Sequence, residues 1–169
     1  MIRFQLAAPE DAETLAIIRQ RAWDSAYRGI YADDLIDQFD YAEHARRFRA
    51  QIKNPDVTLY CIHDGNRMVG FFSIYVPEQP EYKQFSVCLN ALYLLPEYQR
   101  MGIGRQVMAF LTAWCRERNC RVFYNSCNLH NHQARAFYEA MGGVLGEIDA
   151  GYEDRGADQC YYEYVVTDI

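Results

Sequence analysis

Apolar and polar positions change their period several times along the chain, and each change separates two predicted elements. Alternation over residues 2–6 predicts a short first strand. Proline and two acids at 8–11 are typical of a helix start, and the helix they begin continues to Gly29. A second helix is predicted over 32–52, ended by Asn54-Pro55. The apolar stripe of the first helix is Leu15, Ile18, Ala22 and Ala26.

The second half of the chain begins with strands and then alternates helix and strand. A hairpin turn at 64–66 lies between two predicted strands. The elements predicted after the two helices are strands at 57–62, 68–76 and 85–95, a helix from 103, a strand at 121–127, a helix at 132–141, and two strands ending at 160–166. This order predicts a mixed α/β fold, and without linkers or repeats we expect one domain over residues 1–169.

Composition narrows the class of protein. Of the 169 residues, 17 are basic and 23 acidic, a net charge of −6 that weighs against a nucleic-acid partner. No apolar run reaches the roughly 18–20 residues of a membrane span, so no membrane partner is expected. The six cysteines form no C-x-x-C pair and the start of the chain is unlike a signal peptide, which predicts free thiols and a cytoplasmic protein. His130 and His132 lack a nearby third ligand, so no metal is expected.

The most informative segment is residues 92–105, where a strand, a polar turn and two glycines precede a strongly periodic helix. The start of such a helix offers unpaired backbone N–H groups and a partial positive charge, which together attract phosphate. Gly102 and Gly104 would let a phosphate approach the backbone, and Arg100 and Arg105 add full charges. The alternative is a helix start that binds nothing.

Two motifs make the sequence similar to a known family. Gln99-Arg-Met-Gly-Ile-Gly104 fits Q/R-x-x-G-x-G/A, and residues 131–142 fit N-x-x-A-x-x-F-Y-E-x-x-G. In this order they resemble the signatures of the GNAT N-acetyltransferase superfamily. The resemblance implies a central mixed, mostly antiparallel sheet flanked by helices, with acetyl-CoA as co-substrate in a V-shaped gap between the fourth and fifth strands.

The resemblance also assigns cofactor-binding positions. The pantetheine arm of acetyl-CoA would extend the fourth strand through the backbone of Leu92, Tyr93 and Leu94. Asn131 would bind the cofactor near the pantetheine, although a helix cap is an equally good physical explanation for it. The pyrophosphate would bind the backbone N–H groups of Arg100, Met101, Gly102, Ile103, Gly104 and Arg105.

For catalysis, the resemblance implies that Tyr138 is the general acid for the CoA thiolate; the alternative is a core tyrosine beside Phe137. The general base stays open. The family places a glutamate at positions occupied here by Cys88, Asn90 or Ser126, and none of these is a carboxylate. The amine would lose its proton through water held by Asn90 or Ser126, through Glu81 or another acid outside the motifs, or on binding.

The resemblance places the acceptor between the loop joining the first two helices, the fourth strand and the loop joining the last two strands. Aromatic and acidic side chains there suit a cationic amine, although a solvated acidic loop over 149–158 is an alternative. We expect transfer of acetyl to a primary amine of a small molecule, such as a polyamine, or of a protein, by direct attack. The alternative is a non-catalytic acyl-CoA sensor, and a homodimer would be common for the family. The candidate acceptor residues are Trp23, Tyr27, Tyr31, Asn90 and Glu153.

Overall fold

The computed structural model describes residues 1–81 and 86–167. Its strands are β1 (Ile2–Leu6), β2 (Val57–Asp64), β3 (Arg67–Tyr75), β4 (Cys88–Leu94), β5 (Val122–Asn128), β6 (Val144–Asp149) and β7 (Gln159–Val165). Its helices are α1 (Ala12–Ala26), α2 (Asp33–Asp37), α3 (Tyr41–Lys53), α4 (Ile103–Glu117) and α5 (His132–Ala140). In this described part, no helix is both long and apolar enough to cross a membrane.

The strands form one sheet in the order β1-β2-β3-β4-β5-β7-β6. Neighbouring strands are antiparallel except β4 and β5, which are parallel. The predicted fold class, a mixed and mostly antiparallel sheet flanked by helices, is confirmed.

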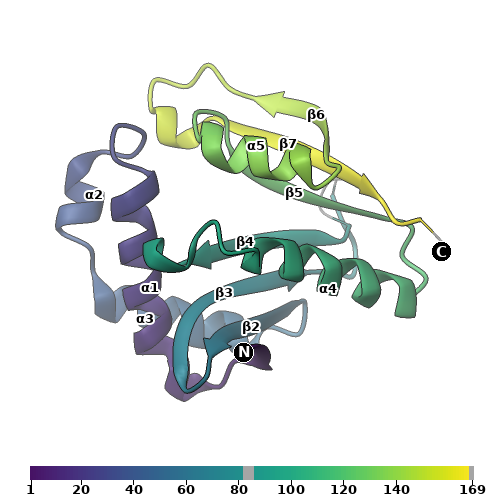
Figure 1. Ribbon diagram of the computed structural model, residues 1–169. Coiled ribbons are helices and arrows are strands. Elements are labelled where there is room, and N and C mark those ends of the chain that lie inside the picture. The colour runs from purple at the N-terminus through teal and green to yellow at the C-terminus, as the bar shows by residue number, and fades with distance from the viewer. Residues whose placement is uncertain (82–85, 168–169) are drawn as a thin grey trace.

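Two successive phenylalanines on β3 show which helices cover which face, because adjacent side chains of a strand point to opposite sides. Phe71 packs edge-on against Phe48 of α3, with ring centroids 5.1 Å apart. Phe72 contacts Phe110 of α4 from the other face, at 5.6 Å. Helices α1 and α3 therefore cover one face, and α4, with α5 beside it in Figure 1, covers the other.

The second predicted helix is wrong as one element, since residues 32–52 form two helices. The chain turns at 38–40, where the Asp40 side chain accepts a hydrogen bond from the backbone N–H of Glu43 and starts α3. The buried ring of Phe39 stacks on His44 at 4.0 Å and fixes this turn. The third predicted strand was also too long: β4 begins at Cys88, and residue 85 lies outside the described residues.

A gap between β4 and β5 opens because the two strands pair over only two positions, Cys88 with Tyr124 and Leu89 with Asn125. On its other side, β4 has a bulge: Leu89 pairs with Ile74 of β3 and Ala91 with Ser73, so Asn90 has no partner. A bulge bends its strand and turns a side chain in a new direction. The bend begins where β4 leaves β5, and Figure 1 shows the two strands diverging.

Candidate active site

A cleft of about 630 Å³ lies between the diverging strands and is closed by α1, α4 and α5. Below it is called the β4–β5 cleft. It brings together most residues that the sequence predicted for cofactor and catalysis, although they come from five separate elements and loops. The predicted residues that line it are Tyr27, Asn90, Leu92, Tyr93, Leu94, Arg100, Gly102, Gly104, Arg105, Ser126, Asn131 and Tyr138.

The edge of β4 that faces the cleft offers backbone groups to an extended ligand, although the C=O of Leu94 already accepts from Nε2 of Gln99 at 3.3 Å. The N–H of Leu95 donates to Val69 of β3, and backbone groups of successive residues in a strand alternate in direction. Leu92 and Leu94 therefore point their N–H and C=O groups toward the cleft, whereas those of Tyr93 face β3. Of the three residues predicted to bind the pantetheine arm through their backbone, Leu92 and Leu94 direct backbone groups into the cleft. Tyr93 lines the cleft with its side chain instead.

The N-terminus of α4 opens into the same cleft without a cap. Gly102 is its N-cap residue, has φ +81°, and no side chain bonds to the first turn. Since the first intrahelical bond runs from Gln106 to Gly102, the N–H groups of Ile103, Gly104 and Arg105 have no helical partner. A left-handed φ at position 102 favours glycine over any other residue. This turn can accept an anion.

Arg100 and Arg105 are exposed beside this turn. Neither forms an ion pair within residues 1–81 and 86–167, although other arginines nearby do. Arg21 and Arg67, for example, both bind Glu97 just before the turn, at 3.0 and 2.9 Å. The two guanidinium groups at the cleft mouth are thus available to a negatively charged ligand.

Gly104 has a further reason to be glycine that the sequence did not indicate. A Cβ there would lie 2.8 Å from Cζ of Phe137, so glycine allows α5 to pack closely on α4. The neighbouring side chains contribute nothing to the cleft: Ile103 is buried in the core, and Met101 is exposed outside it. These two residues offer backbone groups alone.

Asn131 caps α5, as one of the two sequence interpretations proposed, since its Oδ1 accepts from the N–H of Ala134 at 3.1 Å. Its side chain also interacts with the hydroxyl of Tyr27, which approaches from α1. Burial raises the pKa of Tyr27 above its ordinary value, and the contact with Asn131 opposes this shift. Asn131 and Tyr27 thus meet within the cleft.

Tyr138 lies on α5, and its side chain is 7% exposed. Burial raises the pKa of this phenol above the ordinary value of 10, with smaller contributions from Cys127, Tyr93 and Cys88. The hydroxyl is therefore protonated throughout the physiological pH range. A protonated phenol inside a cleft can donate a proton or a hydrogen bond to a developing anion.

Among the residues that the structure describes, no carboxylate lines the β4–β5 cleft. Asn90 and Ser126 do line it, on opposite strands, and each can hold a water molecule by a hydrogen bond. Cys88 is buried, and burial raises the pKa of its thiol to about 12, which makes it a poor base. Glu81 is exposed and lines neither this cleft nor the second hollow.

A second hollow, of about 550 Å³, lies beyond the cleft between α1, α2, α3 and the loop before β7. We call it the acidic hollow. It contains two of the predicted acceptor residues, Trp23 and Tyr31, whereas Glu153 lines neither space. Its charged and aromatic lining residues are Trp23, Tyr31, Asp34, Asp40, Glu43, His44, Arg47 and Asp154.

An aromatic wall separates the two spaces. The rings of Tyr27, on the cleft side, and Tyr31, on the hollow side, stack with centroids 4.4 Å apart. Trp23 packs edge-on against Tyr31 at 5.1 Å, and its indole N–H donates to the hydroxyl of Tyr93 at 3.5 Å. The predicted acceptor residues are thus divided between two compartments that share this wall.

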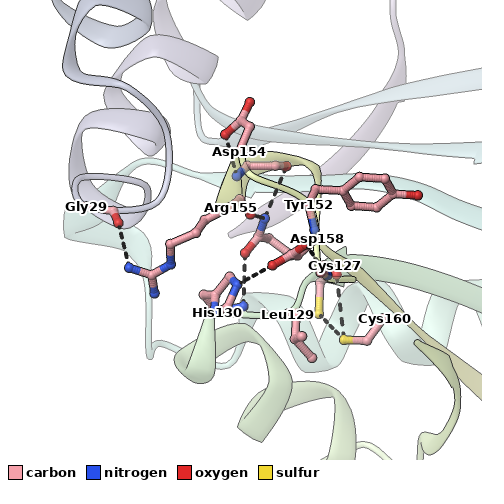
Figure 2. Close-up of polar contacts among 12 residues, drawn as sticks. Gly29, Cys127, Leu129, His130, Tyr152, Asp154, Arg155, Asp158 and Cys160 are labelled. Atoms are coloured by element: carbon pink, nitrogen blue, oxygen red, sulfur yellow. Dashed lines mark hydrogen bonds and ion pairs between the residues drawn. The ribbon is translucent and has the colours of Figure 1, made fainter. Parts of the chain in front are cut away.

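Asp158 fixes the conformation of the loop before β7, a role that the sequence analysis did not predict for it. Asp158, almost fully buried, accepts from the N–H groups of Gly151 and Tyr152 and binds His130 at 2.7 Å. His130, followed by the cap residue Asn131, thereby connects the loop to α5 (Figure 2). The His130 contact is the main reason that the pKa of Asp158 lies below its ordinary value.

The fold and the cleft are those expected of an acyltransferase, and comparison with a family model shows the class. The acetyltransferase (GNAT) family model matches residues 16–143, so the chain belongs to this family.

The individual relatives share less than 30% sequence identity with the chain. The chain is 24% identical to the uncharacterized N-acetyltransferase YuaI of Bacillus subtilis, over 93% of this chain and 96% of that protein. It is 28% identical to an aminoglycoside N(6')-acetyltransferase type 1 of Stenotrophomonas maltophilia, over 80% and 82%. Its fold matches the PaiA N-acetyltransferase of Thermoplasma acidophilum in complex with coenzyme A, with a TM-score of 0.81, 20% identity and coverage of 98% and 99%.

Proposed function

We propose that this protein transfers the acetyl group of acetyl-CoA to a primary amine by direct attack, with the cofactor in the β4–β5 cleft and a cationic part of the acceptor in the acidic hollow. The observation that carries the proposal is the set of unpaired groups at one cleft mouth. The uncapped start of α4 and two arginines without carboxylate partners converge there.

The cleft has the donors that acetyl-CoA requires. The N–H groups of residues 103–105, Arg100 and Arg105 would bind the pyrophosphate. Leu92 and Leu94 would pair with the amides of the pantetheine arm as a strand pairs with its neighbour. The amide NH₂ of Asn131 has two N–H groups, so that besides its contact with Tyr27 it could donate to the same arm. When bound, acetyl-CoA supplies an acyl group activated as a thioester.

Three residues of the cleft would donate or accept protons, directly or through water: Tyr138, Asn90 and Ser126. Tyr138 holds a proton that it can donate to the leaving sulfur, since its raised pKa keeps the hydroxyl neutral. Asn90 and Ser126 would order a water molecule that receives the proton of the attacking amine. Because no carboxylate of the described residues lies on the cleft wall, only the fraction of the amine that has already lost its proton to solvent would attack. The ordered water would then take the second proton, from the nitrogen that has attacked.

The acidic hollow supports an acceptor that is itself cationic. Asp34 and Asp154 attract positive charge, and Trp23 and Tyr31 offer ring faces for cation–π contact. A small molecule with two or more amines fits both spaces: one amine reaches past Tyr27 into the cleft, and another remains in the hollow. The aminoglycoside acceptor named for one relative is of this kind.

The proposal is tested by measuring thiol release from acetyl-CoA across a panel of amines. The panel contains diamines and polyamines, an aminoglycoside, matched monoamines, and peptides with a free N-terminus or lysine. We expect turnover, with diamines and larger polyamines preferred over monoamines of equal length. Turnover of peptides alone would contradict the small-molecule acceptor. Tight acetyl-CoA binding without turnover on any amine would favour a non-catalytic sensor, which a cleft without a carboxylate also allows.

A further inference from the structure

Two cysteines lie side by side at the floor of the cleft. Cys127 of β5 and Cys160 of β7 are directly opposite in the antiparallel register, and their sulfur atoms are 3.6 Å apart (Figure 2). Cys127 lines the β4–β5 cleft, whereas Cys160 is fully buried behind it. Neither takes part in a disulfide.

The backbone geometry at this pair permits a disulfide. Two residues along the same register, Leu129 donates to its opposite residue Asp158 at 3.1 Å, so Cys127 and Cys160 are also a hydrogen-bonded pair. Such pairs have Cα atoms about 5.5 Å apart, within the range of about 4.4–6.8 Å that disulfides span. The two sulfurs would have to approach by about 1.5 Å to reach bonding distance.

We propose that Cys127 and Cys160 form a reversible disulfide when a peroxide enters the empty cleft, so that the floor of the acetyl-CoA site is a redox modification site. This inference uses the proposed function only for the route by which the oxidant enters.

The chemistry balances with one equivalent of hydrogen peroxide. A thiolate sulfur of the pair attacks a peroxide oxygen, the O–O bond breaks, and water leaves after protonation, which yields a sulfenic acid. The second sulfur attacks the first, the S–S bond forms and a second water leaves. Two thiols thereby lose two electrons, which the peroxide accepts.

The surroundings favour a thiolate in this pair. The hydrogen bond with Cys127 is the main reason that the pKa of Cys160 is lowered from its ordinary value; the guanidinium of Arg135 acts in the same direction and burial opposes both. The hydrogen bond with Cys160 and burial raise the pKa of Cys127, so the thiolate lies mainly on Cys160. Transfer of the shared proton across the 3.6 Å contact would expose it as a minor form on Cys127, which faces the cleft. By contrast, burial raises the pKa values of Cys61 and Cys115 to about 12, and these thiols are not expected to react.

The test is intact mass after mild treatment with hydrogen peroxide. The protein carries Cys120→Ser, because Cys120 is the least buried of the six cysteines and could link two molecules. We expect a loss of about 2 Da, restored by dithiothreitol, and a peptide that joins Cys127 to Cys160. A gain of about 16 or 32 Da without this link, or a link between other cysteines, would overturn the proposal.

Cysteine variants test whether Cys127 and Cys160 form the link, and bound acetyl-CoA tests whether the peroxide enters through the cleft. Cys160→Ser should abolish the 2 Da loss and leave a sulfenic acid on Cys127, whereas Cys61→Ala should react like the parent protein. Saturating acetyl-CoA, which has no free thiol to consume peroxide, should slow the link at least about tenfold. Acetyl-CoA that binds by calorimetry but does not slow the link would overturn the cleft as the route. Failure of acetyl-CoA to bind at all would refute the proposed function and leave the cysteine pair to be judged on mass alone.

Discussion

The β4–β5 cleft and the acidic hollow lie back to back across one aromatic wall, yet their charged residues have opposite signs. Over residues 1–81 and 86–167, the charged side chains that line the cleft are Arg100 and Arg105, and no carboxylate lines it. Four carboxylates line the hollow, and its one arginine, Arg47, is paired with Glu43. Two substrates of opposite charge can therefore bind to one chain without competing for the same groups. This difference in charge predicts that substitutions in the lining of one space leave ligand binding in the other space unchanged.

The largest effect is expected inside the cleft, from Tyr138→Phe. Loss of the hydroxyl alone should lower kcat by about 10²–10⁴-fold, with the Kd for acetyl-CoA unchanged. Tyr164→Phe is the matched control, because the Tyr164 hydroxyl is buried without a hydrogen-bond partner and does not line the cleft. Wild-type turnover in Tyr138→Phe, measured with a true acceptor, would leave Tyr138 a packing residue.

The next effect is the dependence of rate on pH. Because no carboxylate lines the cleft, kcat/KM should rise about tenfold per pH unit through neutral pH, toward the pKa of the acceptor amine near 10. The raised pKa of Tyr138 means that no decline from its ionisation should occur below pH 10. A pH-rate series with an acceptor of known pKa measures both. A plateau at neutral pH that disappears on replacing one carboxylate, such as Glu81, would reveal a hidden base.

In the hollow, Asp34→Asn with Asp154→Asn should raise the KM of a charged acceptor by about 1.4- to 5-fold per charge, as exposed ion pairs are worth about 0.2–1 kcal/mol. Added salt should reduce the difference between variant and wild type. Glu10→Gln with Glu117→Gln removes two charges elsewhere and should leave KM unchanged. An unchanged KM in the first variant would indicate a merely solvated acidic surface.

The smallest effect concerns the loop that carries Asp154 to the hollow. The pKa of Asp158 is lowered in the fold, so its contribution to stability is complete above the ordinary carboxyl pKa near 4 and is lost as pH falls through the lower folded value. Asp158→Asn should lower Tm at pH 7 and weaken the dependence of Tm on pH between 5 and 3. Asp149→Asn, an exposed change at the end of β6, should affect Tm less. Parallel Tm curves for wild type and Asp158→Asn would contradict this role.

Local sequence patterns predicted most of the fold, because strand alternation and helical stripes depend on neighbouring residues alone. The break at Asp40 was missed because the helical pattern continues through it, although Asp40 and Glu43 have the spacing of an N-cap and its third helical residue, a local signal of a helix start. The bulge at Asn90 is a property of the register with β3, which no local pattern contains.

The candidate site was predicted through its two motifs, and both lie on the same cleft. The acceptor side was predicted less well: Tyr27 and Tyr31 are four residues apart, yet they face different spaces because their rings stack as a wall between them. The Asp158–His130 contact joins residues 28 positions apart, and the contact of Gly104 with Phe137 joins two helices. Such pairings depend on tertiary packing, so a single sequence does not indicate them.

The most direct test of the cleft as the acetyl-CoA site is calorimetric titration of coenzyme A into two double variants. Arg100→Gln with Arg105→Gln should weaken binding by about 10- to 100-fold, because hydrogen bonds to charged groups contribute about 1.5–3 kcal/mol and each 1.4 kcal/mol is tenfold. Arg46→Gln with Arg49→Gln removes the same charge from α3, at two arginines that line neither space, and should bind like wild type. Equal affinity in all three proteins, or an equal loss in both variants, would contradict a phosphate site at the start of α4.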